Sequence, residues 1–187
     1  MTDYFALLNQ PRRPWLDPEQ LKETFHAKTL QAHPDAQSRT STSSEAAFAD
    51  INEAYQVLRD PKRRLHHLLS LEGNPPSSQS SSVPAEIAEL FPVIADLILE
   101  ADGLAQKIGG ATNSLSRSLL KPQQVAITER IRETVHKLTA LDHEAQSRLK
   151  QVSESNERGE LHMLYLRFSY LTKWIAQLEE KQLSLVL

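Results

Sequence analysis

The stretch "LQAHPDAQS", residues 30–38, ends one predicted helix and opens onto a polar loop. Pro34 stops the helix before it, because the residue that precedes a proline is pushed out of the helical region. Asp17 and Pro18 mark the start of the same helix, as its N-cap and its first helical residue. The stretch therefore predicts a helix of about four turns, followed by a turn that carries an imidazole and a carboxylate.

Two more helices are predicted after this loop. The segment "EAAFADINEAYQVLRD", residues 45–60, has apolar residues at three-and-four spacing, which is typical of a helix with one buried face. Asp60 caps a further helix with Pro61 at its first position, and Gly73 ends it. We expect the helices to pack through a shared apolar core of Phe25, Phe48, Ile51, Tyr55 and Leu58.

A low-complexity tract rich in proline and serine, "GNPPSSQSSSVP", separates this region from the rest of the chain. Three long amphipathic patterns follow, roughly over residues 84–108, 122–152 and 157–183, and no β pattern appears anywhere. Helices of this length bury their apolar stripes by packing side by side. The sequence therefore predicts an all-α protein that ends in an antiparallel three-helix bundle.

Composition excludes several classes of function. The chain has 187 residues, a formal net charge of -3 and no cysteine, so disulfides, thiolate catalysis and cysteine-ligated metals are excluded. The charge gives no overall attraction to nucleic acid or to a membrane, and no apolar run approaches the length of about 18 residues that a membrane span needs. The histidines lack metal-ligand spacing. We expect a soluble cytoplasmic protein without a metal or cofactor.

The N-terminal pattern resembles the J domain of DnaJ-type co-chaperones at three places in the correct order. These are "DYFALL" at residues 3–8, the His33-Pro34-Asp35 triplet, and "FADINEAYQVLRDPKRR" at residues 48–64. The resemblance implies a helical hairpin with short flanking helices. It divides the chain into a J domain over 1–72, a linker over 73–83 and a client-binding bundle over 84–187.

A narrower resemblance, to the HscB co-chaperones of iron-sulfur cluster assembly, covers both domains. It is carried by "RRLHHLLSLEG" at residues 63–73 and by "FSYLTKWIAQLEEK" at residues 168–181. The resemblance implies stimulation of ATP hydrolysis by a DnaK-type chaperone and delivery of an iron-sulfur scaffold protein as client. In that family the J protein hydrolyses nothing itself, so we expect an activator and not an enzyme.

The resemblance also assigns candidate binding residues. The residues implied for the chaperone are His33, Pro34, Asp35, Lys22, Lys28 and Arg63. Ala32 and Ala36 stand where J domains usually carry an aromatic and a basic residue, and this predicts a weakened or partner-selective contact. The residues implied for the client are Ile87, Phe91 and Tyr170, and Trp174 is added because it lies on the same apolar stripe of the last predicted helix as Tyr170.

Three alternatives stay open at this point. The bundle could carry a different client, or the chain could be a degenerate J-like adaptor that stimulates no ATPase. The stripe formed by Met163, Leu166, Tyr170 and Trp174 fits either packing against the J domain or partner binding. The cations at residues 62–64 fit either a solvated face or a contact with an acidic partner.

Overall fold

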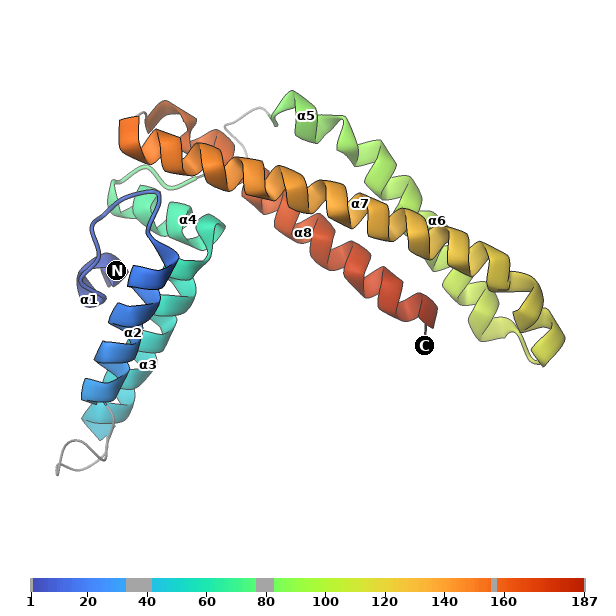
Figure 1. Cartoon of the computed structure of the whole chain (residues 1–187), viewed down its shortest axis with the longest axis horizontal. Helices are drawn as coiled ribbons and strands as arrows, with labels where there is room; N and C mark the ends of the chain where they lie inside the picture. Colours follow the sequence, from blue (N-terminus) through green and yellow to red (C-terminus); the bar gives the residue numbers. More distant parts are fainter. Residues whose placement is uncertain (1, 33–41, 77–82, 156–157, 187) are drawn as a thin grey trace. The chain divides into compact units, whose positions relative to one another are not determined.

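The computed structural model describes residues 2–32, 42–76, 83–155 and 158–186, and helices dominate every one of these ranges (Figure 1). No strand occurs in these ranges, which confirms the all-α prediction. None of the helices in the described ranges has both the length and the apolar composition of a membrane span. The chain forms two compact units, which are taken in turn below.

The first unit contains a helical hairpin made by α2 (Pro18–Ala32) and α3 (Thr42–Arg59). The short α1 (Tyr4–Leu7) precedes the hairpin, and α4 (Pro61–Leu71) follows it (Figure 1). Apolar side chains from all four helices and from the α1–α2 connection meet in one core. Its buried members are Phe5, Leu8, Leu16, Leu21, Ile51, Ala54, Leu58 and Leu68. The predicted J-domain hairpin with short flanking helices is confirmed.

The predicted hairpin core is correct except at its open end. Phe25 and Tyr55 are half-buried and stack with ring centroids 4.1 Å apart, so they do join α2 to α3. Phe48 was expected in the core, but its side chain is 39% exposed, so that prediction is wrong. Phe48 lies two turns nearer the start of α3 than Tyr55, beyond the part of the helix that the core covers.

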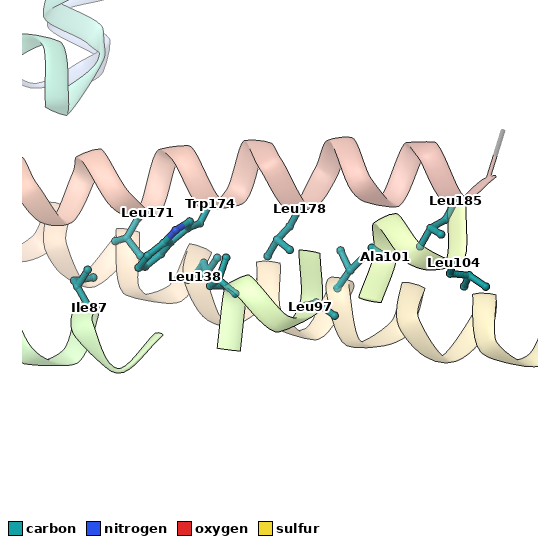
Figure 2. Packing of buried hydrophobic residues seen from close by; sticks show 11 residues of the cluster. Ile87, Leu97, Ala101, Leu104, Leu138, Leu171, Trp174, Leu178 and Leu185 are labelled. Carbon is teal, nitrogen blue, oxygen red and sulfur yellow. The ribbon is translucent and has the colours of Figure 1, made fainter. Parts of the chain in front are cut away.

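The second unit is a three-helix bundle. It contains α5 (Ala85–Ala88), α6 (Leu90–Gly110), the first part of α7 (Ser114–Ser155) and most of α8 (Leu161–Val186). Figure 2 shows side chains from these helices meeting in a single apolar core. Its buried members are Ile87, Ile94, Leu97, Ala101, Leu104, Ile131, Leu138, Leu171, Trp174, Leu178 and Leu185.

Two helices of the bundle differ from their predicted bounds. The first predicted helix is broken at Glu89, which ends α5 and precedes α6, whereas Pro92 lies inside the first turn of α6. The second begins at Ser114, so Pro122 lies inside α7. A proline within a helix removes one backbone hydrogen bond, which is why the sequence pattern placed the start at Pro122.

Ion pairs on the bundle surface give the direction of its helices. Asp102 of α6 pairs with Lys181 of α8 at 2.7 Å, and Glu86 of α5 pairs with Arg167 of α8 at 3.4 Å. Residue numbers rise together along the two segments, so α5 and α6 run parallel to α8. The long α7 connects them in the opposite direction, giving the up-down-up order of an antiparallel bundle.

The units do not follow the order of the chain. The first comprises Met1–Ser81 together with Gln146–Tyr165, and the second comprises Ser82–Ala145 together with Leu166–Leu187. The end of α7, the short 3-10 helix η2 (Arg158–Glu160) and the start of α8 thus belong to the first unit. The predicted boundaries at 72 and 84 stay a prediction, and residues 77–82 of the predicted linker lie outside the described residues.

Candidate functional site

The helix that leads to the His-Pro-Asp triplet is α2. Asp17 caps it, because its carboxylate accepts the backbone N–H groups of Glu19 at 3.0 Å and Gln20 at 3.1 Å. Lys22 is exposed on α2 and Lys28 is half-buried. The helix ends at Ala32, and the predicted residues His33, Pro34 and Asp35 lie outside the described residues.

The third predicted cation, Arg63, lies in the first turn of α4. The carboxylate of Asp60 caps this helix by accepting the Arg63 backbone N–H at 2.8 Å. The Arg63 guanidinium pairs with Glu53 of α3 at 2.7 Å, and both side chains are about half exposed. Arg63 is therefore accessible, although part of its charge is already compensated.

Arg64 fits neither of the two roles predicted for the cations at 62–64. It is 5% exposed, its Nε donates to the Pro14 carbonyl at 2.7 Å, and its Nη1 donates to the Leu58 carbonyl at 2.6 Å. Burial lowers the pKa of Arg64 to about 10, because the charged form has lost contact with water. This guanidinium ties α4 to the end of α3 and to the connection before α2, and it faces no partner.

His67 is a second polar residue of the J domain whose burial sequence reasoning missed. Its Nε2 accepts the Tyr4 backbone N–H at 3.1 Å, and its ring stacks on Tyr4 with centroids 4.6 Å apart. Accepting this hydrogen bond requires an unprotonated Nε2. Burial lowers the pKa of His67, the nearby Asp3 carboxylate only partly opposes this, and the imidazole is held neutral.

A surface depression of about 270 Å³ lies beside His67. Its lining includes the aromatic rings of Tyr4 and Tyr165 and the side chains of Lys62, Arg63 and His66. Among its lining residues there is no carboxylate and no serine, so the depression is lined by cationic, aromatic and imidazole side chains and by Val57. In the described part of the chain, no three histidine or acidic residues gather closely enough to hold a metal ion.

The residues predicted to bind a client come together in the bundle. The Phe91 ring meets the edges of Tyr170 and Trp174 at centroid distances of 5.1 Å and 5.0 Å, and those two rings lie 5.4 Å apart. We call these three residues the aromatic cluster. Edge-to-face pairs of this kind are favourable beyond the area that they bury. The start of α6, which carries Phe91, and one turn of α8, which carries Tyr170 and Trp174, thus form a single aromatic surface.

The four residues predicted to bind a client differ in accessibility. Phe91 is 40% exposed and Tyr170 is half-buried. Trp174 and Ile87 are buried in the bundle core, and Figure 2 shows Trp174 directed from α8 into that core beside Leu138. Phe91 and Tyr170 are therefore the residues that a partner could touch, whereas Ile87 and Trp174 are part of the bundle core.

Arg167 is a neighbour of the aromatic cluster that sequence reasoning did not single out. It lies three residues before Tyr170 on α8, and its guanidinium is within ion-pair distance of Glu86, 3.4 Å away. Its Nε is buried and makes no hydrogen bond in the described structure. The sequence signal that could have identified Arg167 is its position on the predicted last helix, three residues before Tyr170 and seven residues before Trp174.

Comparison with known proteins matches the N-terminal helices to a family model. Residues 3–67 match the model described as the DnaJ domain. The chain is 39% identical over 75 residues to the co-chaperone protein HscB of Proteus mirabilis, which is 38% of this chain and 43% of that protein. It is 40% identical over 75 residues to an HscB homologue of Vibrio cholerae, covering 38% and 44%. These alignments span less than half of the relatives.

Solved structures extend the likeness to nearly the whole chain at the level of fold. Chaperone HscB from Vibrio cholerae superposes with a TM-score of 0.56 at 22% identity, covering 96% of each chain. Human co-chaperone protein HscB superposes with a TM-score of 0.52 at 19% identity, covering 97% of this chain and 82% of the human one. The chain therefore contains a DnaJ domain over residues 3–67, and its fold is similar to that of the HscB structures.

Proposed function

We propose that this protein is a co-chaperone that stimulates ATP hydrolysis by a DnaK-type chaperone and delivers a client to it. The observation that carries the proposal is the DnaJ-domain match over residues 3–67, which includes the His33-Pro34-Asp35 triplet. The triplet follows α2 and precedes α3, the two helices that form the hairpin. Its imidazole and carboxylate offer specific hydrogen-bonding groups, and the nucleotide is hydrolysed on the partner.

The cations near the hairpin would add electrostatic attraction to an acidic chaperone surface. Lys22 is exposed on α2 and has no ion pair to weaken its charge among those described, so we expect it to contribute most among the proposed cations. Arg63 already pairs with Glu53 at 2.7 Å, so its contribution is reduced. We expect Lys22→Ala to weaken chaperone binding more than Arg63→Ala does, and to weaken it most at low ionic strength.

The test is the steady-state ATPase rate of the DnaK-type chaperone encoded in the same genome. The full chain should raise this rate, and His33→Gln should abolish the increase. His136→Gln, on an exposed position of α7, is the matched control and should stimulate normally. Equal stimulation by the unsubstituted chain and His33→Gln would exclude the co-chaperone proposal and favour a J-like adaptor.

The proposed client is an iron-sulfur scaffold protein, held by the exposed part of the aromatic cluster. The resemblance to the HscB co-chaperones of iron-sulfur cluster assembly and the position of Phe91 and Tyr170 on the bundle surface support this choice. Tyr170→Ala should weaken scaffold binding without changing stimulation of the basal ATPase. Loss of both would indicate a folding defect, and Leu183→Ala, at an exposed position of the same helix, is the control for it.

A further inference from the structure

Arg167 occupies the same face of α8 as two members of the aromatic cluster. Tyr170 lies three residues further along the helix and Trp174 lies seven residues further. At 3.6 residues per turn, these spacings place all three side chains within about 60° of one another around the helix axis. Arg167 therefore lies on the face of α8 that carries Tyr170.

The guanidinium of Arg167 is poorly satisfied inside the protein. Its side chain is 20% exposed, and in the described structure its ion-pair partner is Glu86, at 3.4 Å. A charge-assisted hydrogen bond is normally 2.7–2.9 Å long. By comparison, Asp102 and Lys181 of the same unit meet at 2.7 Å. The Arg167 atom that lies 3.4 Å from Glu86 is Nε itself, which is buried and makes no hydrogen bond, so this donor stays unused.

Glu86 is placed to act as a replaceable partner. Its side chain is 50% exposed and it lies on α5, a helix of four residues. An exposed carboxylate at long distance gives little stability. A carboxylate that approached Arg167 beside the rings of Phe91 and Tyr170 would be shielded from water, where a charge pair is stronger. Arginine, tyrosine and tryptophan are also enriched among the residues that contribute most of the binding energy in interfaces.

We infer that Arg167 binds an aspartate or glutamate side chain of the client, and that this carboxylate replaces Glu86. The inference rests on the proposed function, since it takes the client of the aromatic cluster to be the scaffold protein. The planar guanidinium can hold a carboxylate through two parallel hydrogen bonds, which the ammonium of a lysine cannot do. Client recognition thus combines an apolar contact at Phe91 and Tyr170 with one directed charge.

The test is the dissociation constant of the full chain for the scaffold protein of the same genome, measured by isothermal titration calorimetry. Arg167→Gln should weaken binding about tenfold or more, the loss expected for one charge-assisted contact. Arg167→Lys should lie between this variant and the unsubstituted chain. Glu86→Gln should strengthen binding several-fold, because it removes the internal competitor. A folding defect cannot produce such a gain.

The control is Arg130→Gln, which removes an exposed arginine of the bundle that pairs with Glu100 at 2.5 Å. It should bind normally. Unchanged affinity of Arg167→Gln, together with weakened binding by Tyr170→Ala, overturns the inference and leaves the proposed function standing. Weakened binding by Glu86→Gln also overturns the inference. Failure of the unsubstituted chain to bind the scaffold overturns the inference and the proposed client together.

Discussion

Replacing Arg64 by methionine is expected to destabilise the first unit, called the J-domain unit below, far more than the replacement of any other single cationic residue would. The substitution removes both donors to the Pro14 and Leu58 carbonyls, at 2.7 Å and 2.6 Å. A buried carbonyl left without a partner costs about 1–3 kcal/mol, which applies to Leu58, and the part-buried Pro14 carbonyl adds a smaller cost, so the two together cost at most about 6 kcal/mol. Removal of a desolvated charge, whose pKa burial lowers to about 10, offsets part of this loss. We expect a net loss of about 3 kcal/mol.

Urea unfolding of the full chain measures this loss, with tryptophan fluorescence as the signal. The chain has two tryptophans, Trp15 in the J-domain unit and Trp174 in the bundle, so a Trp174→Phe background leaves a reporter for the first unit alone. At a slope of about 2 kcal/mol per molar urea, the midpoint should fall by about 1.5 M.

Arg63→Met is the matched control, because it removes a neighbouring arginine of the same helix whose ion pair with Glu53 is exposed. Its expected cost is at most about 1 kcal/mol. Midpoints that fall equally for the two variants would refute the assignment of Arg64 to a buried structural role. A normal midpoint for Arg64→Met would do so as well.

Three further outcomes are expected. Lowering the pH through about 6.5 should destabilise the J-domain unit, because residue His67 takes up a proton at a higher pH in the unfolded chain than in the folded one, where burial lowers its pKa. His67→Phe should reduce this pH dependence in urea midpoints measured from pH 8 to pH 5. Ile87→Ala should cost about 2–5 kcal/mol in thermal unfolding of the bundle, whereas Leu183→Ala should cost under about 1 kcal/mol. Asp60→Ala should cost about 1 kcal/mol and Asp60→Ser much less, in the same urea assay.

Local signals in the sequence were sufficient to predict where the helices α2 and α4 of the J domain begin. Asp17 with Pro18 and Asp60 with Pro61 mark the starts of α2 and α4 in the structure, because capping depends on neighbouring residues alone. The three residues of the aromatic cluster were also named from the sequence, Phe91 and Tyr170 through the resemblance and Trp174 through its place on the apolar stripe of the last helix. Its contacts, however, come from the structure.

Burial was predicted less well, because it depends on what a helix packs against. The three-and-four period identifies the apolar face of α3 but not where the core ends, so Phe48 was misplaced. The charge of Arg64 suggested solvent, whereas two backbone carbonyls 50 and 6 residues away hold it inside. Arg167 carried no motif, and its significance comes from the distance to Glu86, which no sequence pattern encodes.

The assignment of Gln146–Tyr165 to the J-domain unit has a consequence for synthesis of the chain on the ribosome. Contacts of this unit join Glu72 to Arg158 and Trp15 to Lys150, so they link residues more than 80 positions apart. The α2–α3 hairpin can form early, since its contacts are close in sequence. The complete unit cannot form until the α7–α8 connection has emerged, so the first unit to begin folding is finished only after most of the second has been made.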